Sequence, residues 1–176
     1  MEDVAIIGVG LHPFGRHDKS AFEMGAEAVE FALQDAGVQW KDVNCAFGGA
    51  WEVAQADPLV GLLGLTGIPF MNVFNACATG AAITQQAANA IVAGAGDIVV
   101  AVGMDKHPRG SFKVDPTLTN VPEWYGENGQ FVTTKFFGMK INKYMHDCGV
   151  THETLAKVAA KNYRNGSINP NAFRRK

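Results

Sequence analysis

The first hundred residues alternate between short apolar runs and longer amphipathic stretches. The apolar runs predict four strands, at residues 4–9, 43–47, 70–74 and 98–103. The stretches between them predict three helices: one from a Ser20–Glu23 capping box to Gly37, one from Asp57-Pro58 to near Gly67, and one of small residues from Gly80 to Ala93. Apolar strands alternating with helices favour an α/β fold, a mostly parallel sheet covered by helices on both faces.

The rest of the chain has a different pattern. Prolines and aromatic residues without clear periodicity mark a loop region, of a length that usually has a function. Two helices follow, one ending at Gly149 and one capped by Thr151 and closed by Asn165-Gly166. We predict one domain over residues 1–176, with a core at 1–104, a loop region at 105–133, returning helices at 134–165 and a tail at 166–176.

Composition and charge narrow the classes of function. The 176 residues carry a formal net charge of −2, which argues against nucleic acid or an anionic membrane as the main partner. No apolar run reaches the ~20 residues of a membrane span, and the N-terminus lacks the basic region of a signal peptide. Three widely spaced cysteines favour reduced thiols and a cytoplasmic location. The five histidines show no metal-ligand spacing, so no metal site is expected.

Two glycines after the first predicted strand, Gly8 and Gly10, form the beginning of a dinucleotide-binding motif. The third glycine of that motif is missing, because Pro13 stands in its place. Pro13 also disfavours a helix opening there. The sequence therefore predicts no tightly bound cofactor.

Cys77 is the candidate catalytic residue. It follows the predicted strand at 70–74 and precedes a helix, whose free N–H groups and dipole can stabilise a thiolate. Small neighbouring residues leave room for a substrate. The alternative is that Cys77 is a small apolar residue packed between helix and sheet, the commonest role of a buried cysteine. The other two cysteines, Cys45 and Cys148, are predicted to lie in the core.

His107 lies in the cluster Asp105-Lys-His-Pro-Arg109, just after the fourth predicted strand. The carboxyl ends of parallel strands are where α/β proteins build their sites. His107 is therefore predicted either in a pocket wall or in a solvated turn.

Several segments carry a family resemblance. They are Ala5 to Gly10 with His12 to Arg16, Val73 to Gly80, Val102 to Lys106 with Gly110 to Phe112, Phe137 to Met139, Tyr144 to Gly149, and Ala160 to Asn162. Together they resemble the thiolase superfamily, and within it the lipid-transfer-protein (sterol-carrier-protein-x) type. The run Ala76-Cys-Ala-Thr-Gly80 alone is also typical of fatty-acid ketoacyl synthases, which share this fold. The flanking segments favour the lipid-transfer branch.

The resemblance implies the N-terminal half of a thiolase fold, with an inserted loop region that helps to cover the pantetheine arm. Cys77 would attack a 3-ketoacyl-CoA or acetyl-CoA and carry the acyl group, with coenzyme A as a substrate. Backbone N–H groups at the helix start would hold the oxyanion. The family also implies a homodimer through the strand before Cys77. The residues expected along the acyl-CoA pocket are Asn75, Ala76, Gly80, His107, Phe137, Gly138 and Met139.

Two departures from the family pattern limit this interpretation. Thiolases commonly have a histidine–methionine pair where this chain has Phe136-Phe137, so the acyl-chain preference stays open. The family takes its base histidine, a second cysteine and the last strand of the N-terminal half from sequence absent here, which predicts an exposed sheet edge. Two alternatives therefore remain: a thiolase-fold retro-aldolase acting on steroid side-chain or other acyl-CoA with an OB-fold partner subunit, and an inactive half-domain that needs its complement.

Overall fold

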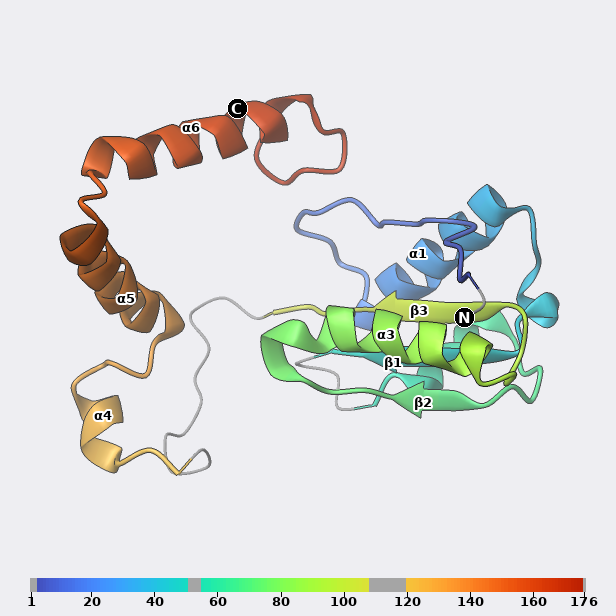
Figure 1. The fold of residues 1–176 in the computed structure, drawn as a ribbon. Helices are drawn as coiled ribbons and strands as arrows, with labels where there is room; N and C mark the ends of the chain where they lie inside the picture. Colours follow the sequence, from blue (N-terminus) through green and yellow to red (C-terminus); the bar gives the residue numbers. More distant parts are fainter. Residues whose placement is uncertain (1–2, 51–54, 108–119, 176) are drawn as a thin grey trace. The chain divides into compact units, whose positions relative to one another are not determined.

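The computed structural model describes residues 3–50, 55–107 and 120–175. The chain divides into two units, residues 1–107 with 170–173, and residues 108–169 with 174–176 (Figure 1). The elements of the first unit are α1 (Ala21–Ala36), the 3₁₀ turn η1 (Trp40–Asp42), β1 (Cys45–Gly49), η2 (Asp57–Leu59), α2 (Val60–Leu63), β2 (Phe70–Asn72), η3 (Ala76–Ala78), α3 (Thr79–Val92) and β3 (Val99–Gly103). Those of the second are α4 (Glu123–Glu127), α5 (Thr133–Cys148) and α6 (His152–Ile168).

The strands of the first unit form a parallel sheet in the order β2-β1-β3. In the central strand β1, Ala46 is paired with Phe70 of β2 and with Val100 of β3. At the carboxyl end of the same ladder, Gly49 is paired with Gly103. Three of the four strands that the sequence predicts are therefore confirmed, each within two residues of its predicted start.

Helices cover both faces of this sheet (Figure 1). On one face, Ala46 of β1 joins a buried cluster with Val29 and Leu33 of α1. On the other face, Cys45 and Phe47 of the same strand pack with residues of α3. Because successive side chains of a strand point to opposite faces, a central strand between two helical layers must be apolar at every position. The predicted α/β class is confirmed.

The predicted ends of α1 are also confirmed. The Glu23 backbone N–H donates to Ser20 Oγ over 3.2 Å, and the Ser20 N–H donates to Glu23 Oε2 over 2.7 Å. Gly37 ends the helix at φ 70°, in the left-handed region that glycine adopts without steric cost. The hydrogen bond from the Ser20 backbone, with that from its side chain, holds the pKa of the Glu23 carboxyl below its usual range.

Replacing Ser20 with alanine is expected to lower the free energy of unfolding by about 1 kcal/mol, since one N–H of the first turn loses its acceptor. Ser20→Thr keeps the hydroxyl and serves as the control. The lowered pKa of Glu23 gives a contribution that is fully present above the usual carboxyl range and is lost as the pH falls through the folded-state pKa. Urea unfolding at neutral and acidic pH measures both effects. Equal midpoints for the alanine and threonine variants would contradict the capping role.

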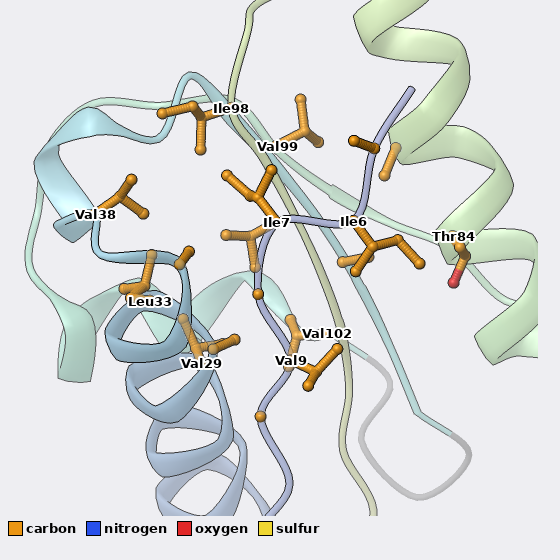
Figure 2. Close-up of a pocket in the computed structure, with 18 of the residues that line it drawn as sticks. Ile6, Ile7, Val9, Val29, Leu33, Val38, Thr84, Ile98, Val99 and Val102 are labelled. Carbon is orange, nitrogen blue, oxygen red and sulfur yellow. The ribbon is translucent and has the colours of Figure 1, made fainter. Parts of the chain in front are cut away.

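The predicted strand at residues 4–9 is wrong. This segment lies across a cavity of about 520 Å³ from β3, with α1 and α3 residues also lining it (Figure 2). Among the described residues, β3 pairs only with β1. A Cβ on Gly8 or Gly10 would overlap backbone oxygens of α1, so the segment packs on that helix and not on a neighbouring strand. An apolar run therefore predicts extended backbone here, but a strand also requires a ladder partner.

Two helix boundaries also differ from prediction. The helix at Asp57-Pro58 begins as the 3₁₀ turn η2 after Ala56 and ends with α2 at Gly64, not near Gly67. Asp57 does not cap it; its Oδ1 instead accepts a hydrogen bond from Asn72 Nδ2 over 2.8 Å. At the other end of the chain, α6 continues through Asn165-Gly166 to Ile168. A single glycine costs a helix only about 1 kcal/mol, so it need not end one.

The second unit contains both predicted helices. Gly149 ends α5 at φ 66°, and the Thr151 hydroxyl caps α6 by accepting from the Thr154 N–H. The short helix α4 was not predicted from the sequence. No described side chain of α4, α5 or α6 is buried, and Cys148 is exposed, so its prediction as a core residue is wrong. An apolar stripe predicts a packing face, but no described residue of this unit covers that stripe enough to bury it.

Candidate active site

The candidate site is the turn between β2 and α3. The Val73 N–H donates to the Gly48 oxygen over 2.9 Å, which holds the chain beside β1 as it leaves β2. The chain then forms the 3₁₀ turn η3, closed by a 2.9 Å hydrogen bond from the Ala78 N–H to the Asn75 oxygen. The 14-residue helix α3 begins at Thr79. Cys77 therefore lies in the turn that directly precedes a long helix.

The cysteines of the first unit differ in their surroundings. Cys77 is exposed, whereas Cys45 is 2% exposed and packs against α3. Burial raises the pKa of the Cys45 thiol, which disfavours its reactive thiolate form. The alternative role of Cys77 as a residue packed between helix and sheet is therefore wrong for this structure. Cys77 is the thiol of this unit that a substrate can reach.

The backbone at Ala76 is strained. Its φ is 45°, in the left-handed region that residues with a Cβ rarely adopt. The Thr79 side chain, 9% exposed, spans this turn: its hydroxyl accepts from the Asn75 N–H over 2.9 Å and donates to the Ala76 oxygen over 2.7 Å. The Thr79 backbone N–H donates to the same Ala76 oxygen. These bonds compensate a conformation that costs of order 1–3 kcal/mol.

Gly49 at the end of β1 allows the turn to come close to the sheet. A Cβ at Gly49 would overlap the Val73 carbonyl oxygen and lie 2.7 Å from Thr79 Cγ2 and 3.2 Å from Ile83 Cδ1. The absence of a side chain at Gly49 thus sets the separation between β1 and the segment that carries Cys77.

The predicted pocket residues are distributed over both units. Asn75, Ala76 and Gly80 flank Cys77, and a Cβ at Gly80 would meet no other atom. His107 follows β3 in the same unit, with its Nε2 3.4 Å from Asp105 Oδ2.

Three further predicted pocket residues lie on α5 of the second unit: Phe137, Gly138 and Met139. The Phe137 ring packs edge-on against Phe136, and the Lys140 ammonium lies 4.5 Å from the centre of the Phe136 ring. A pocket role for these three residues stays a prediction.

Sequence reasoning missed Thr79 and Gly49 as residues that shape this turn. A threonine four residues after Asn75, at a helix start, is a pattern typical of hydroxyl–backbone turns and could have indicated Thr79. The close approach at Gly49 depends on the crossing of two chain segments, which no local pattern reveals. The cavity beside residues 4–10 contains none of the predicted site residues in its lining.

The described residues contain neither a metal site nor a membrane-spanning helix. Across residues 3–50, 55–107 and 120–175, no group of three or more His, Cys, Asp or Glu is placed to hold a metal ion. Likewise, no helix in the described part of the chain is long and apolar enough to cross a membrane.

Comparison with known proteins adds family evidence. Residues 4–175 match the family model of the thiolase N-terminal domain. The chain is 33% identical to an acetyl-CoA acetyltransferase of Methanothermobacter thermautotrophicus, over 98% of this chain and 47% of that protein. It is 29% identical to sterol carrier protein 2 of Gallus gallus and 28% identical to the benzoylsuccinyl-CoA thiolase subunit BbsB of Thauera aromatica, over 95% and 97% of this chain and 33% and 45% of those proteins.

A solved structure, the Ltp2-ChsH2(DUF35) aldolase, has the same fold. It superposes with a TM-score of 0.78 at 23% sequence identity, over 96% of this chain and 44% of that chain. The chain thus spans about half or less of the length of the relatives and of the solved structure it matches.

Proposed function

The chain belongs to the thiolase family, because residues 4–175 match that family's N-terminal domain, and on that premise we propose that it forms part of an acyl-CoA acyltransferase in which Cys77 accepts the acyl group. The observation that carries the proposal is the exposed thiol of Cys77 in the turn before α3. A helix N-terminus stabilises negative charge, and a thiolate is the nucleophilic form of cysteine.

The chemistry follows from that position. The Cys77 sulfur attacks the thioester carbonyl of an acyl-CoA, a new C–S bond forms, and the coenzyme A thiolate leaves. With a 3-ketoacyl-CoA, attack at the keto carbon breaks the bond between C2 and C3, and acetyl-CoA leaves after protonation of its C2 carbanion. The positive N-terminal end of the α3 dipole stabilises the oxyanion formed in either case. Coenzyme A is therefore a substrate, in keeping with the thiolase family.

Acetyl-CoA is the probe for this proposal. We expect mass spectrometry of the protein incubated with acetyl-CoA to find an acetyl group on the Cys77 peptide, and to find none in Cys77→Ser. Cys148→Ser is the matched control, because Cys148 is exposed but lies in the other unit, and it should keep the adduct. An adduct that persists in Cys77→Ser would remove Cys77 from the mechanism.

A second function is favoured by the likeness to the aldolase structure. A thiolase-fold retro-aldolase would cleave a steroid side-chain or other acyl-CoA together with a small OB-fold partner subunit, and that reaction does not require Cys77 as its nucleophile. That structure is an Ltp2-ChsH2(DUF35) aldolase, so its name pairs Ltp2 with a DUF35 protein. Turnover of acyl-CoA that survives Cys77→Ser would favour this second function over the first.

The remaining proposals concern assembly. We expect a homodimer through the strand before Cys77, as the family implies, with His107, Phe137, Gly138 and Met139 along the acyl-CoA pocket.

Residues 1–176 alone are expected to take up an acyl group without catalysing repeated turnover, because the family places its catalytic base in a C-terminal half. Steady-state thiolysis by these residues alone would overturn that expectation.

A further inference from the structure

We propose that Thr79 is the positioning residue of the nucleophile: its hydroxyl holds Ala76 in the left-handed conformation and thereby sets the direction of the Cys77 thiol. This inference rests on the proposed function, because it gives Thr79 a role through Cys77. Thr79 itself touches no substrate in this mechanism.

The hydrogen bonds of Thr79 join the two sides of the strained residue. The hydroxyl accepts from the N–H of Asn75, the residue before Ala76, and donates to the Ala76 oxygen. A hydroxyl offers a single proton, and here that proton goes to the oxygen of the peptide bond that leads into Cys77. That peptide plane is thus fixed at the bond from which the Cys77 backbone starts.

Burial makes this clamp rigid. Thr79 is 9% exposed, and its methyl group packs so closely against Gly49 that a Cβ added there would lie 2.7 Å from Thr79 Cγ2. Thr79 is the only polar residue that is buried among the described residues. No buried side-chain nitrogen or oxygen of those residues lacks a hydrogen-bond partner. Loss of the hydroxyl would leave the Asn75 N–H without its acceptor and would allow Ala76 to relax to negative φ, which turns Cys77 away from the start of α3.

Alkylation by iodoacetamide measures the direction of the thiol without acyl chemistry. Thr79→Val keeps the shape of the side chain and removes the hydroxyl, and we expect Cys77 to react about three- to tenfold more slowly, the size of a lost helix-terminus interaction. Thr79→Ser restores the hydroxyl and should react within about twofold of the original chain. Cys148, in the other unit, is the internal reference for the reagent, and Cys45 reports any loss of the buried core.

A double variant separates positioning from general damage. Glycine adopts positive φ without strain, so Ala76→Gly in the Thr79→Val chain should recover part of the lost rate. An unchanged or faster rate in Thr79→Val, an equal loss in Thr79→Ser, or no recovery in the double variant would each overturn the positioning role.

A measurement on the unmodified chain covers the case in which Thr79→Val does not fold. The Asn75 amide is bonded to a buried hydroxyl although Asn75 itself is exposed, so its hydrogen exchange should be slowed relative to its neighbours. Free exchange there would overturn the proposal. Slowed alkylation in Thr79→Val without any acetyl group on Cys77 would instead overturn the acyltransfer proposal and leave the positioning role standing.

Discussion

Replacing Gly49 with alanine is expected to destabilise the first unit by about 3 kcal/mol, at the upper end of what overpacking costs. The added Cβ would overlap the Val73 carbonyl oxygen, which is backbone and cannot rotate away. The same atom would press on Thr79 Cγ2, so the turn that carries Cys77 would be pushed off the sheet. We therefore expect slower alkylation of Cys77 together with the loss of stability.

Gly103→Ala is the matched control for this prediction. Gly103 is the ladder partner of Gly49 on β3, and a Cβ there would meet no other atom. Its free energy of unfolding should change by no more than about 0.5 kcal/mol. Urea unfolding followed by tryptophan fluorescence compares the two variants. Equal midpoints for Gly49→Ala and Gly103→Ala would show that the close approach at Gly49 does not contribute to the stability of the first unit.

Local patterns predicted the first unit well wherever one physical signal was sufficient. The capping box at Ser20 and the left-handed Gly37 fix both ends of α1 through bonds between near neighbours in sequence. The strand β3 was predicted because a run without polar side chains at 98–103 is suited to a layer between helices. The position of Cys77 before α3 followed from the same alternation of strand and helix.

Prediction failed where the result depends on a distant partner. Residues 4–9 have the composition of a strand, but their neighbours are α1 and a cavity, so no ladder forms. The apolar stripe of α5 indicated that Cys148 is buried, yet burial requires a second surface, which the described residues of its own unit do not supply. The clamp at Thr79 was missed because it depends on a positive φ at Ala76, and an alanine in the sequence does not indicate that conformation.

The expected cost of Ile83→Ala is about 2–5 kcal/mol, the range for removing most of a fully buried aliphatic side chain. Ile83 is 1% exposed, one turn after Thr79, and packs with Cys45 and Phe47 of β1. Ile83→Val removes one methylene and should cost about 0.5–1.5 kcal/mol. Val92→Ala is the control: Val92 is the last residue of the same helix and is 52% exposed, so its replacement should change the free energy of unfolding by no more than about 0.5 kcal/mol.

The thiol of Cys45 shows whether this loss is local to α3. Leu59, 0% exposed, belongs to the buried cluster on the other face of the sheet, so Leu59→Ala should cost a similar 2–5 kcal/mol, roughly, without loosening the contact between α3 and β1. If the N-terminal turns of α3 are held mainly by Ile83, Cys45 should be alkylated faster in Ile83→Ala than in an equally destabilised Leu59→Ala. Equal rates would mean that the unit unfolds only as a whole. In that case α3, with the Cys77 turn before it, would separate from β1 no more easily than the rest of the unit unfolds.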